Sequence, residues 1–275
     1  MINGHPQKAL SFRVPINFDL LKHWIDHFYG YGSWDAPIWF VSHEDGGGDL
    51  PEEVEEKLNY FHKAFPSVTE PTLCDIRELY KHTTFRIAGP KAGAFTSLFD
   101  YRFGKNGMLS GVWKNLIAFS HAHRNEKLPD SLIYQGNSFA INNEALIKLY
   151  PLPAPHNHAW YYSWLDMPQF PFMKSRGLYE AHLFPLRMKV ILSNIIKHKP
   201  KLVLMYGMSN INALKKSFPS ISFKMVKAEK RRTPQHHRAQ LGQTTLIITT
   251  QIPALRHGRV ETGFDWGVFG RVVGG

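Results

Sequence analysis

Short apolar runs alternate with amphipathic segments along most of the chain. The run at 37–42, PIWFVS, lies between a proline and a glycine-rich turn, which is typical of a strand buried on both faces. Three similar runs follow, EALIKLY at 144–150, KPKLVLMYG at 199–207 and TTLIITT at 244–250. The pattern therefore predicts four buried strands.

Two amphipathic segments flank the first of these runs. Residues 16–30 have the spacing of a helix that ends at a glycine. The segment 51–65 predicts a second helix, with Asp49 as its N-cap and Pro51 in its first turn.

Helical patterns also fill most of the remaining chain. Residues 73–124 are mostly helical in pattern, and 180–198 predict a helix that begins near Pro185. Residues 208–218 predict another helix, with Ser209 as its cap. A basic, histidine-rich loop is expected at 227–243.

Strands that alternate with helices predict an α/β fold with a mostly parallel, helix-covered sheet. We expect a single domain over 1–275 around four parallel strands, with a mostly helical insertion at about 60–143. Ligands of such sheets bind at the carboxyl ends of the strands. These ends are expected at 42–48, 150–158, 207–210 and 250–258.

The net charge of +11 and the pI of about 9.6 favour a polyanionic partner, with nucleic acid first. The alternative is a generally basic protein.

One cysteine, Cys74, excludes a disulfide framework and a zinc or iron–sulfur site built on cysteines. No apolar run approaches the roughly 20 residues of a membrane span, and the N-terminus lacks a signal-peptide core, so we expect a cytoplasmic protein.

The first strand runs into His43, Glu44 and Asp45, followed by three glycines, Gly46, Gly47 and Gly48. The following helix directs its positive end at this turn and favours ionised carboxylates there. The glycines let a ligand approach the backbone amides. A fixed carboxylate could orient a water molecule or stabilise a developing cation. The alternative interpretation is a glycine turn with solvated acids.

The second strand ends at Tyr150 and continues into the stiff loop PLPAPHNHAWYY. Its aromatic side chains could stack on a base, and its histidines could contact a phosphate or a base edge. Two alternatives remain, a metal site that uses the two histidines and a packed surface loop. The polar candidates of this loop are His156, Asn157 and His158.

The fourth strand leads into a loop with an apolar residue among cations. Leu255 could enter a DNA base stack while the cations hold phosphates, or it could pack against the core. The cations beside it are Arg256, His257 and Arg259. A basic run upstream offers a phosphate-binding surface or a solvated loop, and it includes Lys230, Arg231, Arg232, His236, His237 and Arg238.

Together these features resemble the uracil-DNA glycosylase superfamily, whose four parallel strands are flanked by helices. Its first motif follows the first strand and its second motif follows the last. The resemblance covers the order of elements over most of 37–270 but few identical residues. The KP pair at 199–200, before a strand that ends in glycine, also fits the third strand of the family.

The first motif of the family reads GQDPYH in one branch and GEAPG or GMNPG in others. Laid on SHEDGG, Ser42 takes the first glycine, Glu44 the catalytic aspartate and Asp45 the proline, while Gly46 takes the tyrosine or the last glycine of the shorter forms. The resemblance implies that Glu44 activates water and stabilises the sugar cation. His43 or Asp45 takes this role if the register slips.

Two other family residues are not matched. The second motif, HPSPLS, falls on TQIPAL with Pro253 at its second proline, and Thr250 or Gln251 stands where the family has its histidine. The asparagine that reads uracil is replaced by Leu149 or Tyr150.

The glycine at position 46 changes the expected substrate. In the GQDPYH branch a tyrosine fills the space beside C5 of the base, and Gly46 would leave this space open, with Gly47 and Gly48 widening it. Some members of the superfamily remove modified bases from phage DNA in bacterial defence. The resemblance thus implies a 5-modified pyrimidine, for example glucosylated hydroxymethylcytosine.

The predicted reaction is hydrolysis of the N-glycosidic bond of a flipped-out nucleotide by a monomeric, monofunctional enzyme. Polar groups near Gln251, Asn210 or His156 would stabilise the leaving base. We expect no metal or organic cofactor. No lysine stands out as a Schiff-base nucleophile, which favours a monofunctional enzyme. The alternatives are a uracil-DNA glycosylase of base-excision repair, a non-catalytic nucleic-acid-binding module, or a metal-dependent nuclease that uses Asp45, His156 and His158.

Overall fold

Strand β2 (Ile38–Ser42) lies inside the sheet, and all five of its residues are buried. It pairs in parallel with β4 (Glu144–Lys148) on one side and with β5 (Leu202–Met205) on the other. β5 pairs in parallel with β8 (Thr244–Ile248). These strands correspond to the four apolar runs, so the predicted α/β fold with a mostly parallel sheet is confirmed.

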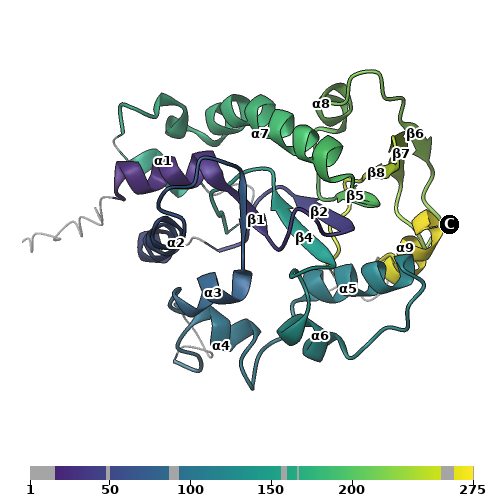
Figure 1. The fold of residues 1–275 in the computed structure, drawn as a ribbon, viewed down its shortest axis with the longest axis horizontal. Helices are drawn as coiled ribbons and strands as arrows, with labels where there is room; N and C mark the ends of the chain where they lie inside the picture. The colour runs from purple at the N-terminus through teal and green to yellow at the C-terminus, as the bar shows by residue number, and fades with distance from the viewer. Residues whose placement is uncertain are drawn as a thin grey trace, which may run out of the picture.

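The computed structural model describes residues 16–47, 50–86, 93–155, 160–165, 167–254 and 263–274. Within these ranges the sheet has eight strands in the order β3-β1-β4-β2-β5-β8-β7-β6, and the expected number of four was too low. Four strands extend the parallel centre on both sides (Figure 1). They are β1 (Phe28–Tyr31), β3 (Thr72–Cys74), β6 (Lys224–Val226) and β7 (His236–Leu241).

The predicted helix at 16–30 is wrong at its end. Helix α1 (Phe18–His27) stops at His27, and the next residues form β1, which pairs antiparallel with β4. Gly30 has a φ of 133°, and a Cβ there would lie 2.0 Å from the carbonyl oxygen of Leu146. The glycine is therefore needed for the close approach of β1 to β4.

The predicted loop at 227–243 is also partly wrong, because β7 occupies 236–241. β7 pairs antiparallel with β8, and Gly242, with a φ of 57°, lies in the turn between them. Only His236 and Ala239 of this strand are buried. The basic residues at its more exposed positions hid the strand pattern in the sequence.

The helices cover both faces of the sheet, with α7 on one face and α5 on the other (Figure 1). Successive residues of β2 point to opposite faces. The Trp39 ring accordingly lies 6.4 Å from that of His198 in α7, and the Phe40 ring lies 5.9 Å from that of Phe119 in α5. The other helices are α2 (Pro51–Ala64), α3 (Ile76–Lys81), α4 (Leu98–Arg102), α5 (Gly111–His123), α6 (Ser131–Asn137), α7 (Arg176–His198), α8 (Ile211–Lys216) and α9 (Trp266–Gly274).

Two short 3-10 helices, Tyr161–Trp164 and Pro171–Lys174, lie between β4 and α7. The start of α7 corrects a prediction, because the helix begins at Arg176 and includes Pro185. A proline removes one helical hydrogen bond, and the buried side chains along this 23-residue helix compensate for that loss.

The caps of two other helices differ from those expected. Leu50 is the N-cap residue of α2 and makes no side-chain cap, while Asp49 lies outside the described residues. Asn210, and not Ser209, caps α8, because its side-chain oxygen accepts a hydrogen bond from the amide of Ala213.

Arg187 of α7 fixes the end of β4 from inside the core. Its guanidinium is buried and donates hydrogen bonds to the carbonyl oxygens of Lys148 and Phe28, both at 2.8 Å, and of Leu149 at 3.2 Å. It also lies 3.4 Å from the ring centroid of Tyr29. These contacts hold α7, β1 and the last residue of β4 together.

No helix in the described ranges combines the length and the apolar character that crossing a membrane requires.

We expect Gly30→Ala to lower the free energy of unfolding by about 2 to 4 kcal/mol, because the new Cβ meets a backbone oxygen and the φ is unfavourable. Gly136→Ala in α6 is the matched control, since its Cβ would meet no atom within 4 Å. Alanine there should stabilise the helix by up to about 1 kcal/mol. Urea denaturation measures both, and equal stabilities of the two variants would contradict the role given to Gly30.

Candidate functional site

The segments that follow the parallel strands are joined to one another at the carboxyl edge of the sheet. The amides of Leu149, Tyr150 and Ala154 donate to the carbonyl oxygens of Ser42, His43 and Asp45, at 2.9, 2.8 and 3.0 Å. The pairing of β2 with β4 thus continues past both strands. It fixes the turn after β2 against the turn after β4.

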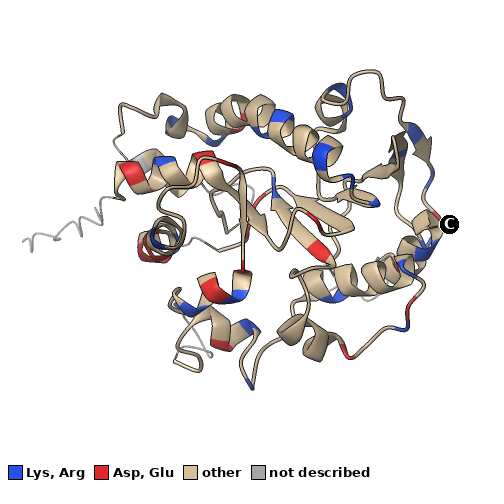
Figure 2. Ribbon diagram, in the orientation of Figure 1, with Lys and Arg blue, Asp and Glu red and all other residues tan. Residues whose placement is uncertain are grey.

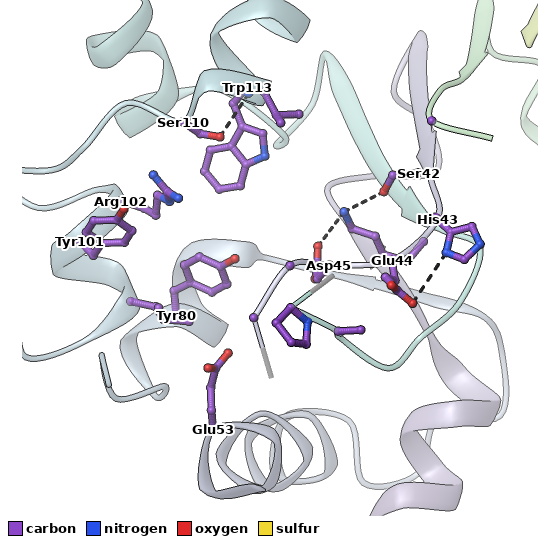
Figure 3. Close-up of a pocket in the computed structure, with 18 of the residues that line it drawn as sticks. Ser42, His43, Glu44, Asp45, Glu53, Tyr80, Tyr101, Arg102, Ser110 and Trp113 are labelled. Carbon is purple, nitrogen blue, oxygen red and sulfur yellow. Dashed lines mark hydrogen bonds and ion pairs between the residues drawn. The ribbon is translucent and has the colours of Figure 1, made fainter. Parts of the chain in front are cut away.

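A cavity of about 670 Å³ opens at this edge (Figure 3). One wall is formed by the ends of β2 and β4 and the residues that follow β5 and β8. The other wall belongs to α3, α4 and α5. The chemistry of the first wall comes from Ser42, His43, Glu44, Asp45, Lys148 and Tyr206, and that of the second from Tyr80, Tyr101, Arg102 and Trp113.

Asp45 is held by two partners inside the cavity. Its carboxylate lies 2.7 Å from the ammonium of Lys148 and accepts a hydrogen bond of 2.5 Å from the hydroxyl of Tyr31. Burial is the largest single influence on the pKa of Asp45 and raises it, but the charge and hydrogen bond of Lys148, the charge of Lys57 and the hydrogen bond from Tyr31 together lower this pKa by more. Its pKa therefore lies below the usual range, and the carboxylate is ionised at neutral pH.

Lys148 is the last residue of β4, and its side chain is buried against the cavity. Its ammonium donates to Asp45 and, at 3.0 Å, to the hydroxyl of Ser42 (dashed lines, Figure 3). Burial is the largest single influence on the pKa of Lys148 and lowers it, but the charge and hydrogen bond of Asp45, with Tyr206 and Glu44, together raise this pKa by more, so the amine stays protonated.

Glu44 is held in a different network. Its carboxylate accepts a hydrogen bond of 2.5 Å from Arg176 at the start of α7, and it lies 3.7 Å from the ring of His43. Arg176 also binds Glu180 at 2.7 Å. In Figure 3 the Glu44 side chain is turned toward His43, whereas Asp45 is on the side of Tyr80.

The opposite wall is aromatic and cationic. The guanidinium of Arg102 lies 4.3 Å from the ring centroid of Tyr101 and 5.9 Å from that of Trp113. Trp113 stacks on Phe103 with ring centroids 5.7 Å apart. Aromatic and guanidinium planes of this kind bind flat ligands such as nucleobases.

The two described glycines of the turn after β2 differ in what they allow. A Cβ on Gly46 would meet no atom within 4 Å, and its backbone is outside the left-handed region. Gly47 has a φ of 100°, and its Cβ would lie 3.0 Å from the carboxylate of Glu53. Gly47 is thus required by the turn, and Gly46 leaves open space at the cavity.

The structure brings together part of the predicted site. His43, Glu44, Asp45, Gly46 and Gly47 all line the main cavity. Tyr150 and Asn210 instead line a second pocket of about 280 Å³, which shares His43 with the main cavity. Gln251 lines neither, and its carbonyl oxygen accepts a hydrogen bond from the amide of Gly207.

Other predicted residues lie away from the cavity or outside the described ranges. Arg231 and Arg232 are exposed in the turn before β7, and His237 and Arg238 lie in β7 itself. Figure 2 shows mainly Lys and Arg on α8 and β6, and several Asp and Glu residues on α1, α2 and α3. The predicted residues outside the described ranges are Gly48, His156, Asn157, His158, Leu255, Arg256, His257 and Arg259.

Several cavity residues were missed in the sequence. Lys148 carries a signal in the sequence, since a lysine inside the apolar run 144–150 is unusual. Tyr80, Tyr101, Arg102 and Trp113 had no such signal, because they come from the helical insertion, whose position over the strand ends is a tertiary feature.

Within the described part of the chain, no group of three or more His, Cys, Asp or Glu side chains is arranged to hold a metal ion. Asp45, one residue of the alternative nuclease site, is paired with Lys148 and Tyr31.

Comparison of the chain with models of protein families, with curated proteins and with solved structures finds no match in any of the three.

Because Lys148 neutralises Asp45, we expect Lys148→Met to lower the free energy of unfolding at pH 7 by about 3 kcal/mol. In the wild type, the pair contributes stability that is lost only as the pH falls through the lowered pKa of Asp45, below about 4. Without Lys148, burial raises the pKa of Asp45, so the deficit should shrink as the pH falls from 7 to 5.

Urea denaturation at both pH values measures this effect. The double variant Lys148→Met/Asp45→Asn removes both charges and should regain much of the lost stability. A deficit that is independent of pH and unchanged in the double variant would contradict the pairing.

Proposed function

We propose that this chain is a monofunctional DNA glycosylase that hydrolyses the N-glycosidic bond of a flipped-out, 5-substituted pyrimidine and leaves an abasic site. The observation that carries the proposal is the main cavity. It sets an ionised carboxylate and a buried ammonium against a wall of aromatic and guanidinium groups, at the edge of the sheet where ligands of α/β proteins bind. A flipped base needs such a stacking surface beside a reactive group.

We also propose that β4, β2, β5 and β8 with their helices have the arrangement of the uracil-DNA glycosylase superfamily. In support, the first predicted motif directly follows β2, and the second follows β8, the last of the four parallel strands. Strands β1, β3, β6 and β7 would then be additions to that core.

We assign the main catalytic role to Asp45 and not to Glu44, which the alignment with the family motif favoured. Asp45 is ionised and, of the two carboxylates, lies nearer to Tyr80 of the opposite, aromatic wall (Figure 3). Glu44 is bound by Arg176 at 2.5 Å and is turned toward His43. Its role would be to fix the turn after β2.

In the proposed reaction the C1′–N1 bond breaks and its electron pair leaves with the base. The carboxylate of Asp45 stabilises the cationic sugar that results and orients a water molecule. The oxygen of this water bonds to C1′, and its proton passes by way of solvent to the base. No metal or organic cofactor takes part in these steps.

The monofunctional assignment is supported by the protonation of Lys148. A lysine must be neutral to attack C1′ and form a Schiff base. The charge of Asp45 keeps the amine of Lys148 protonated, so water is the better nucleophile.

The substituent on C5 is proposed from the space beside Gly46. The open volume there and the size of the cavity leave room for a group larger than a methyl, such as a glucosylated hydroxymethyl group. Exposed cations, including Lys216, Lys224, Lys227 and Lys230, would hold the DNA backbone. Insertion of Leu255 into the duplex remains a prediction.

A non-catalytic DNA-binding module is the main alternative. It would account for the basic surface and the aromatic wall. It gives no reason for a partly buried carboxylate in the wall of the cavity, because a carboxylate repels phosphate.

The first test is base release from duplex and single-stranded DNA with EDTA present. We expect the wild type to form abasic sites in DNA with glucosylated hydroxymethylcytosine, and Asp45→Asn to reduce the rate by about 1000-fold, since a group that stabilises the transition state is lost. Alkaline cleavage of the product scores the abasic sites.

Glu44→Gln is the matched control and should lose far less activity than Asp45→Asn. A larger loss in Glu44→Gln would return the catalytic role to Glu44. Release from uracil DNA alone would favour the repair enzyme, and DNA binding without release from any substrate would favour the binding module.

A second prediction concerns Gly46→Tyr. The backbone of Gly46 accepts an L-residue, so the protein should fold while the ring fills the space beside C5. We expect release of the large modified base to fall at least about 100-fold, because overlap in a packed site excludes the substituent. Competition between large and small 5-substituents measures the shift, and unchanged preference would contradict the open-space argument.

A further inference from the structure

The ammonium of Lys148 is a buried cation in the wall of the main cavity. A lysine ammonium has three N–H donors. Two are used, by Asp45 at 2.7 Å and by Ser42 at 3.0 Å. Among the described residues the third N–H has no hydrogen-bond acceptor, although the side chain is buried.

We propose that Lys148 is a catalytic residue that donates this third hydrogen bond to the leaving pyrimidine, at its O2 atom, and stabilises the negative charge that the base acquires. The inference rests on the proposed function and goes beyond it. It assigns the group that stabilises the leaving base, a role for which none of the described candidates from the sequence is suitably placed.

The geometry supports this role because Lys148 and Asp45 are in contact. If Asp45 faces C1′ of the sugar, the ammonium beside it lies close to the base atoms attached to C1′. O2 is bonded to C2, the neighbour of N1, and therefore lies on this side of the base. The negative charge that develops on N1 and O2 would face a cation in a water-poor site, where such an interaction is strong.

The other cations of the cavity are engaged on its far wall. Arg86 forms a two-point ion pair with Glu56, with distances of 2.9 and 2.5 Å. Arg102 stacks against Tyr101 and donates to the carbonyl oxygen of Met108 at 3.2 Å. Both come from the helical insertion, whereas Lys148 is next to the carboxylate.

The competing explanation is structural, with Lys148 only neutralising Asp45. Lys148→Met distinguishes the catalytic from the structural explanation, provided that the stability of the variant is measured as well as its activity. With a catalytic role, kcat for release of the modified base should fall by about 100-fold, as for the loss of one donor to a developing anion. The Kd for DNA with a 2′-fluoro nucleotide, which is hydrolysed too slowly to react, should change far less.

Lys57→Met is the matched control. Lys57 is also buried and pairs with a carboxylate, Glu53, at 2.6 Å, and its charge also lowers the pKa of Asp45, but it does not itself line the main cavity. Lys57→Met should therefore lose stability but lose much less kcat than Lys148→Met. Lys148→Gln removes the charge but keeps a polar N–H donor on a shorter side chain, and it is the substitute if the Met variant does not fold.

Chemical rescue tests the ammonium itself. Lys148→Cys treated with bromoethylamine gains a thioether side chain of nearly the length of lysine, with a terminal ammonium. The natural Cys74 is buried, and burial raises its pKa well above the usual range, so it should not react in the folded protein. We expect at least a tenfold recovery of kcat, and no change in treated wild type.

The outcomes are distinct. Wild-type release together with normal kcat in the Met or Gln variant would overturn the role of Lys148 and leave the glycosylase intact. Failure of the wild type to release any base would overturn the proposed function and this inference together. If the variants do not fold, the NMR signal of the Lys148 ammonium in wild type decides, since it should shift on binding 2′-fluoro DNA and an unchanged signal would overturn the inference.

Discussion

The ion pair between Asp45 and Lys148 is the interaction on which the site depends. It joins the turn after β2 to the last residue of β4, and each charge keeps the other ionised where burial alone would oppose it. Removing either partner leaves an uncompensated buried charge. The pair therefore serves the fold at the edge of the sheet and supplies the cavity with two opposite charges in contact.

The pair is possible because of the parallel centre of the sheet. Parallel strands bring their carboxyl ends to one edge, and the backbone bonds beyond Ser42 and Lys148 continue the register of β2 and β4. Arg187 of α7 anchors the end of β4 by donating hydrogen bonds to the carbonyl oxygens of Lys148 and Leu149. The helical insertion then closes the cavity from the opposite side with Tyr80, Tyr101, Arg102 and Trp113.

The sequence was informative where structure is local. The apolar runs predicted β2, β4, β5 and β8, and the acidic-glycine turn after β2 predicted one wall of the cavity. β1 was missed because FYGY continues the aromatic spacing of α1, and β7 because HHRAQL is mostly polar. Tyr150 and Asn210 were expected in the same site as Asp45 but line the neighbouring pocket, because tertiary packing sets which pocket each side chain beyond the strands enters. The aromatic wall depends on tertiary packing of α3, α4 and α5.

The contrast between Gly46 and its neighbours has an evolutionary consequence. Gly30 and Gly47 are fixed by backbone geometry, so changes there affect folding before they affect any ligand. Gly46 has an ordinary backbone and open space, which makes it free to vary without a penalty in the fold. A lineage could therefore narrow or reshape the cavity by single substitutions at this position. The ligand of the cavity could thus change while the scaffold stays constant.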